Sequence, residues 1–121
     1  MSTMTKNKKL GKYKTEKGQA IIIIVFSLIG LFGMAALAVD GGNAYLERRK
    51  TQAAADAAAL SGAIARITGE DWRIAALASA NSNGYDNDGI TNTVELNTPP
   101  IGGPHASNPE YIQVIVTSHL D

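Results

Sequence analysis

Residues 20–39 read AIIIIVFSLIGLFGMAALAV, an uncharged run of twenty residues in which Ser27, Gly30 and Gly33 are the least apolar members. A helix rises about 1.5 Å per residue, so the run spans about 30 Å, which is the thickness of a bilayer's hydrocarbon core. The run therefore predicts a single transmembrane helix, placed at residues 19–40. The positions taken to represent this membrane anchor are Ala20, Ile24, Leu28, Leu31 and Val39.

Charge is distributed unevenly around that run. Residues 1–19 hold six lysines and one glutamate, whereas residues 20–121 hold five basic and ten acidic side chains. Because basic residues flank the cytoplasmic side of membrane helices, the N-terminus is expected in the cytoplasm and the rest on the opposite side of the membrane. The lysine tract lacks arginine and has Tyr13 as its one aromatic residue, so we expect attraction to anionic lipid and no nucleic-acid partner.

A cleaved secretory signal is the main alternative to a permanent anchor. Ala36-Leu37-Ala38 has the small-x-small form of a cleavage site after a basic leader and an apolar stretch. The apolar run is longer than the usual apolar region of a signal peptide, about 7 to 15 residues, which favours the anchor.

Composition and chain organisation together predict an α+β fold. The 121 residues include no cysteine, which excludes disulfides, zinc–thiolate sites and a cysteine nucleophile. The predicted plan is a basic cytoplasmic leader (1–18), the transmembrane helix (19–40), an extracytoplasmic Ala-rich helical region (41–82), and an Asn/Gly/Pro-rich loop and strand region (83–121).

The Ala-rich segment at residues 43–67 contains no proline, so it is expected to continue the membrane helix outward. Residues at spacings of three and four form what we call the apolar stripe: Ala53, Ala57, Leu60, Ile64 and Ile67. Such a stripe suits close packing against another helix, and packing against the chain's own C-terminal part is an equally weighted alternative.

Beyond Gly69, residues 71–80 are expected to form a short second helix, with Trp72, Ile74, Leu77 and Ala78 lying on the long one. Residues 92–97 and 111–117 alternate in polarity and predict two strands. Two strands alone make a marginal hairpin in water, so they need the helices or a partner.

Candidate metal ligands lie in the Asn/Asp/Gly-rich turn before the first strand. Residues 84–95 can be laid on a twelve-residue calcium loop, with Asp86, Asp88 and Glu95 at ligand places. Gly84 occupies the first ligand place and a strand follows, so a turn rich in Asx residues is favoured and no metal is assigned.

No catalytic constellation is present in the sequence. Ser61 and Ser107 have no nearby histidine with an orienting acid, and no G-x-S-x-G or phosphate-binding loop occurs. His105 and His119 lack the spacing of a metal-binding helix and are expected to face solvent. We therefore expect a protein without enzymatic activity or cofactor.

Several of these stretches together resemble the N-terminal Tad domain of TadG-like proteins of the Tad (Flp) pilus system. The resemblance covers about residues 17–65. It rests on the motifs KGQA at 17–20, LAVDGG at 37–42, YLERR at 45–49 and QAAADAAALSGA at 52–63. Its key positions are Gly18, Gln19, Asp40, Gly41, Gly42, Tyr45, Gln52, Asp56 and Leu60.

The resemblance implies a bitopic inner-membrane protein that helps to assemble, anchor or export an adhesive pilus. Pilins or assembly proteins are the implied partners of the Ala-rich helix, and a homo-oligomer is compatible with it. The basic leader ending in Gly18 also resembles a prepilin processing site, although Ile23 stands where prepilins have an acid. A secreted or pilin-like adhesive module with weak calcium binding is the alternative function.

Overall fold

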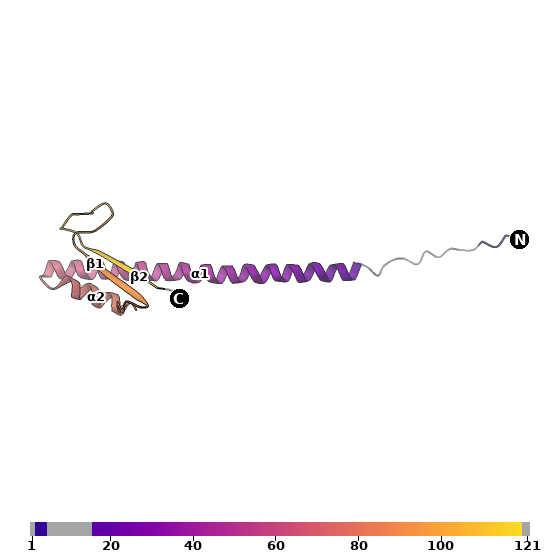
Figure 1. Ribbon diagram of the computed structural model, residues 1–121, viewed down its shortest axis with the longest axis horizontal. Coiled ribbons are helices and arrows are strands. Elements are labelled where there is room, and N and C mark those ends of the chain that lie inside the picture. Colours follow the sequence, from indigo (N-terminus) through magenta and orange to yellow (C-terminus); the bar gives the residue numbers. More distant parts are fainter. Residues whose placement is uncertain (1, 5–15, 120–121) are drawn as a thin grey trace. The chain divides into compact units, whose positions relative to one another are not determined.

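The computed structural model describes residues 2–4 and 16–119. It has the expected α+β architecture (Figure 1). In chain order the elements are α1 (Glu16–Thr68), α2 (Trp72–Ser82), β1 (Asn92–Asn97) and β2 (Gln113–Ser118). Packing divides the chain into two units, Met1–Gly41 and Gly42–Asp121, and α1 contributes to both. Most of the leader predicted at residues 1–18 lies outside the described residues.

Helix α1 continues through the glycine pair at residues 41 and 42, as predicted. It ends where Gly69 adopts a left-handed φ of 82°, a conformation open to glycine because it has no Cβ. The amide of Glu70 donates to the carbonyl of Ala65 at 2.8 Å, which closes the last turn. Gly69 therefore fixes where the chain leaves α1 and turns back.

Helix α2 begins at the capping residue Asp71, whose carboxylate accepts from the amides of Arg73 (2.9 Å) and Ile74 (3.4 Å). Trp72 is buried, which confirms its expected role as a packing anchor. The other positions predicted to pack were wrong: Ile74 and Leu77 are exposed, and so is Ala78.

The side of α2 that packs inward instead carries Trp72, Ala76 and Ala80, at intervals of four residues. At Ala76 the approach to α1 is close, because a Cβ built on Gly62 would lie 3.3 Å from the Cβ of Ala76. Small residues permit such close packing of two helices.

Strands β1 and β2 form an antiparallel pair in which Val94 lies opposite Val116 and Leu96 opposite Val114. Strand β1 occupies its predicted residues, whereas β2 starts two residues later than predicted and ends one later. Valines and leucine of both strands face the helices. The connecting loop is tied to α1 by Arg66, whose guanidinium donates to the carbonyl of Pro109 at 2.8 Å.

The core of the second unit is built mainly from small side chains. Its buried members are Ala54, Ala58, Ala76, Ala80, Tyr85 and Val94, and Leu96, Val114 and Val116 pack against it. An alanine buries little apolar area, so this core depends on close backbone approach more than on large interlocking side chains. Trp72 and Tyr85 are its largest buried residues in the described part of the chain.

Candidate functional site

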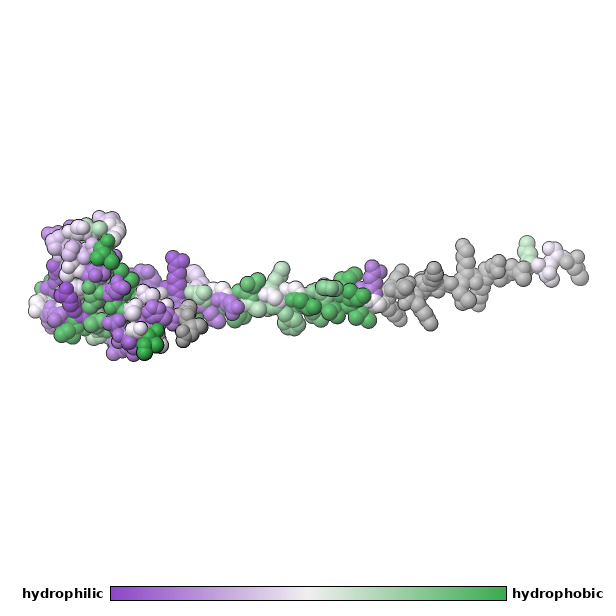
Figure 2. Space-filling model, viewed as in Figure 1, coloured by the Kyte–Doolittle hydropathy of each residue, from purple (hydrophilic) through white to green (hydrophobic). Residues whose placement is uncertain are grey.

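The apolar segment of α1 exposes its large side chains. Phe26 is 70% exposed, Leu31 63% and Leu37 74%, and no part of the described fold covers the segment. Figure 2 shows the corresponding hydrophobic surface along α1. The five anchor positions from the sequence all lie on it and are exposed: Ala20, Ile24, Leu28, Leu31 and Val39. By length and composition α1 can cross a membrane, and it is the one such helix among the described residues.

The one hydroxyl group in the apolar segment, that of Ser27, is hydrogen-bonded within the helix. The Oγ of Ser27 donates to the carbonyl of Ile23 one turn earlier, at 2.8 Å. Polar groups in lipid must be satisfied within the protein, so this bond removes the cost of placing Ser27 among aliphatic residues. A Cβ on Gly30 or Gly33 would meet no atom within 4 Å, so neither glycine marks a close contact with the described part of the chain.

In the second unit, α1 packs through what we call the small-residue face: Ala54, Ala58, Gly62 and Ala65. Gly62 marks the tightest point of this face. A Cβ there would lie 3.1 Å from Cδ1 of Ile112, 3.2 Å from the carbonyl oxygen of Trp72 and 3.3 Å from Cβ of Ala76. Glycine at this position therefore lets α2 and Ile112, the residue before β2, approach the same turn of α1.

The apolar stripe predicted from the sequence lies on another side of α1. Leu60 is 64% exposed, Ile64 54% and Ile67 86%, so the chain's own C-terminal part does not cover it. The alternative that this stripe packs within the chain was therefore wrong. The predicted stripe begins at Ala53 and the buried face begins at Ala54. Because successive helical residues are rotated by about 100°, this difference of one position places the two sets on different sides of α1. The chain thus covers a face of small residues and leaves the larger ones open.

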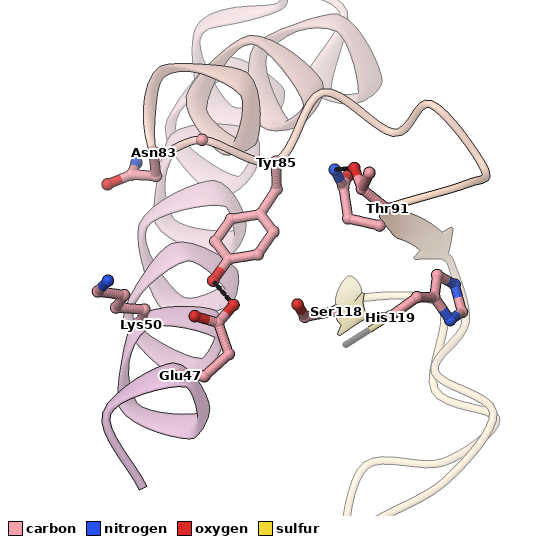
Figure 3. A pocket seen from close by; sticks show the side chains of 9 residues that line it. Glu47, Lys50, Asn83, Tyr85, Thr91, Ser118 and His119 are labelled. Carbon is pink, nitrogen blue, oxygen red and sulfur yellow. Dashed lines mark hydrogen bonds between the residues drawn. The ribbon is translucent and has the colours of Figure 1, made fainter. Parts of the chain in front are cut away.

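A polar hollow of about 350 Å³ lies between α1, the turn after α2, and the outer end of the sheet (Figure 3). The phenol of Tyr85 donates to Oε1 of Glu47 at 3.1 Å across it. Burial, and then the hydrogen bond and charge of Glu47, raise the pKa of Tyr85, which favours the protonated donor. The other lining residues that Figure 3 labels are Lys50, Asn83, Thr91, Ser118 and His119.

The residues of this hollow serve to hold two segments of the chain together. Its acid and phenol are bonded to each other, and His119 at its rim is exposed. The second histidine, His105, is also exposed and stacks on Tyr111 with ring centroids 3.9 Å apart. The Tyr85–Glu47 bond joins residues 38 positions apart and holds the chain after α2 against α1.

The three candidate calcium ligands do not converge. Asp88 accepts from the amides of Ile90 and Thr91, both at 2.8 Å, and from that of Asn92 at 3.1 Å. These backbone bonds hold the pKa of Asp88 at about 2, with Ile90 the largest cause. Oδ1 of Asp86 accepts from the side-chain Nδ2 of Asn92 at 2.9 Å, while Glu95 is exposed on β1. No cluster of three or more acidic or histidine side chains occurs within residues 2–4 and 16–119.

The positions taken from the family resemblance are mostly exposed and separate. Gln52 and Asp56 are brought together, with Nε2 of Gln52 donating to Oδ1 of Asp56 at 2.9 Å along one turn of α1. The other seven positions are exposed along α1: Gly18, Gln19, Asp40, Gly41, Gly42, Tyr45 and Leu60. Sequence reasoning missed the residues that hold the fold, namely Ala54, Ala58, Gly62 and the Glu47–Tyr85 pair. For Ala54, Ala58 and Gly62 the available signal in the sequence was that small residues recur every four positions.

Comparison with known families finds a match that is confined to α1. Residues 18–65 match the Tad family, described as "Putative Flp pilus-assembly TadE/G-like". No curated protein and no solved structure matches the chain. The matched region starts at the apolar segment and ends at Ala65, the last member of the small-residue face, so α1 carries the family features. Residues 18–65 of the chain are therefore similar to a Tad domain of the TadE/G-like kind.

Proposed function

We propose that this protein is a membrane-anchored structural component of Tad/Flp-type pilus assembly or export and performs no catalysis. One observation carries the proposal: the Tad domain consists of an uncovered apolar segment followed by a helix face on which the fold is built. A pilus-assembly structural role follows from the family, and the exposed apolar segment supplies the means of anchoring.

The proposed topology places the N-terminus in the cytoplasm and residues 41–121 outside the inner membrane. Support comes from the six lysines before the apolar run, against Asp40 directly after it and no basic residue until Arg48. The four segments proposed from the sequence then acquire separate tasks: the leader sets orientation, residues 19–40 anchor, residues 41–82 contact partners, and residues 83–121 brace the helix.

The proposed contact surface for pilins or assembly proteins is the apolar stripe. Leu60, Ile64 and Ile67 are exposed on α1 next to the small residues Ala53 and Ala57, a combination that suits lateral packing of another helix. An exposed apolar row of this kind is typical of an interaction surface. A second copy of the chain could use the same surface and form a homo-oligomer.

Membrane fractionation together with determination of the mature N-terminus tests the anchoring. The full chain with a C-terminal tag is expressed in a bacterium, membranes are washed with alkaline carbonate, and the product is identified by mass spectrometry. An intact, carbonate-resistant species is expected. A product starting at Gln19 would indicate prepilin-like processing, and a soluble product starting at Val39 would contradict the anchor and favour the secreted adhesive module.

Site-specific crosslinking tests the contact surface. Because the chain has no cysteine, Ile64→Cys introduces a single thiol on the apolar stripe, and Arg73→Cys on exposed α2 is the matched control. In a host that assembles a Tad pilus, Ile64→Cys should crosslink to a pilin or assembly protein and the control should not. Equal crosslinking from both positions would argue against a specific surface.

A further inference from the structure

The two edges of the sheet differ in how their backbone groups are satisfied. The amide of His119 donates to the carbonyl of Thr91 at 2.8 Å, which fixes the alternation of the antiparallel ladder. By that alternation, Asn92 and Val94 direct their backbone groups away from β2, and Val114 and Val116 direct theirs away from β1.

The outer edge of β1 is closed by the preceding turn. Asp88 accepts from the amide of Asn92 at 3.1 Å, Gly89 donates to the carbonyl of Asn92 at 3.0 Å, and Oδ1 of Asn87 accepts from the amide of Val94 at 2.8 Å. The Asn/Asp/Gly-rich turn thus takes the place of a neighbouring strand. This edge offers few backbone groups to another polypeptide.

The outer edge of β2 has no such cover. Within the described residues, no hydrogen bond joins the outward amide and carbonyl groups of Val114 or Val116 to another part of the chain. An open edge of this kind is a template for an added strand, since only an extended backbone can meet successive outward groups at this spacing.

A groove lies directly beside this open edge. It has a volume of about 300 Å³ and lies between residues 114–116 and the side of α1 that carries Ala55 and Ala59. Arg48 and Asp56 also line it, and both are exposed. Further hollows continue it along α1 toward Ser118 at one end and Ile112 at the other. We call this feature the edge groove.

The two charged residues that line the edge groove, Arg48 and Asp56, favour a bound strand with charges at matching positions. Arg48 and Asp56 are eight residues apart on α1, or about 12 Å at 1.5 Å per residue. Four residues of a strand span about 13 Å and return to the same face. A strand facing α1 with an acid opposite Arg48 and a base four residues away opposite Asp56 therefore fits both charges.

We propose that the edge groove binds an extended segment of another protein, which adds antiparallel to β2 as a third strand. Arg48 lines a hollow with Val116 and Ser118, whereas Ala59, further along α1, lines one with Ile112, so α1 and β2 run in opposite directions beside the groove. The acid therefore precedes the base in an antiparallel segment. Small or β-branched apolar residues between them cover Ala55 and Ala59. Within residues 1–121 no acidic residue is followed four positions later by a basic one, so none of these residues supplies the pattern that the groove selects. This inference does not depend on the pilus role.

Binding of designed peptides to the full chain in detergent micelles tests the proposal. The probe is fluorescein-labelled TETVTKT, measured by fluorescence anisotropy, and the charge-exchanged peptide TKTVTET is the control. TETVTKT should bind about 3- to 10-fold more tightly, as expected for two exposed charge pairs. The double variant Arg48→Glu with Asp56→Lys should reverse this preference. Both substitutions are on the surface, and circular dichroism verifies that the fold is kept.

N-methylated peptides test the strand pairing separately from charge. Methylating the valine amide of TETVTKT, which would face β2, should weaken binding at least tenfold, whereas methylating a threonine amide on the opposite edge should not. Bound peptide should also slow hydrogen exchange at the Val114 and Val116 amides. Equal affinity for both charge patterns, equal effects of both methylations, or no binding at millimolar peptide would each overturn the proposal.

Discussion

Two stretches of α1 use apolar residues of opposite size. Residues 20–39 carry Ile, Leu, Phe and Val on all sides, and all are exposed; residues 54–65 bury Ala and Gly on one side. Lipid accepts any shape, so large side chains all round serve the first stretch. A folded partner is satisfied by close backbone approach, which favours the smallest side chains. In this helix, large side chains mark the stretch that the fold leaves uncovered, and small side chains mark the stretch against which the rest of the unit packs.

The strongest way to break the lipid-facing stretch is to charge it. Leu28→Lys together with Leu31→Lys should abolish carbonate-resistant membrane insertion, because each lysine near the centre of a membrane helix costs about 2.5 to 3.5 kcal/mol. Leu28→Ala with Leu31→Ala is the control that keeps the segment uncharged. Retention of the lysine variant in washed membranes would contradict a transmembrane role for the segment.

Next in size is loss of the one large anchor in α2. Trp72→Ala should destabilise the second unit by about 3 to 5 kcal/mol, because Trp72 is buried against the core. Thermal unfolding of the full chain in detergent, followed by circular dichroism, measures the loss. Ile74→Ala changes an exposed neighbour in the same helix and should shift the transition far less.

Adding a single methyl group at Gly62 or at Gly42 compares a packed position of α1 with an unpacked one. Gly62→Ala should destabilise the second unit by about 1 to 3 kcal/mol, since the added Cβ would meet a backbone oxygen and two side chains at 3.1 to 3.3 Å. Gly42→Ala lies on the same helix with no atom within 4 Å, and should instead stabilise it by up to about 1 kcal/mol. Hydrogen exchange at the amides of α2 reports both; equal shifts in the same direction would show that Gly62 is not a packing site.

Substitutions in the apolar stripe should reduce partner binding while leaving the stability of the second unit nearly unchanged. Ile64→Gln should change stability by no more than about 0.5 kcal/mol, because Ile64 is more than half exposed. The same substitution should reduce partner crosslinking in a pilus-producing host, measured from a thiol placed at Ile67. A clear drop in stability without loss of crosslinking would reassign this stripe to the fold.

The smallest effect concerns acid. The pKa of Asp88 is lowered from 3.8 to about 2, so its contribution to stability is complete above about pH 3.8 and is lost as pH falls toward 2. Asp88→Asn should remove this dependence in that range. Amide exchange at Ile90 and Asn92 measured between pH 5 and 2 compares the two proteins, and parallel profiles would contradict the role of the carboxylate.

Much of the fold was predictable because its signals are local. The uncharged run at residues 20–39, the breaker Gly69 and the alternating residues of β1 each define an element without reference to the rest of the chain. The packing faces were not predictable in the same way. Alanine occurs on every side of residues 53–59, so hydrophobic periodicity followed the few large residues, which the fold leaves exposed.

The sequence could not supply contacts between distant residues. The hydrogen bond between Tyr85 and Glu47 depends on the path of α2, and the tight space around Gly62 depends on α2 together with the residue before β2. The calcium pattern at residues 84–95 illustrates the converse. Asp86 and Asp88 lie in the segment before β1, but Asp88 accepts hydrogen bonds from backbone amides and Glu95 lies apart on β1.

The four-residue spacing of Ala54, Ala58 and Gly62 also governs which changes in length the gene can tolerate. One inserted residue between Ala54 and Gly62 would rotate everything beyond it by about 100° and swing Gly62 away from α2. An insertion within residues 20–39 would expose the same kind of surface to the same lipid. Related chains should therefore vary in length before Asp40 and remain constant in length between Ala54 and Gly62.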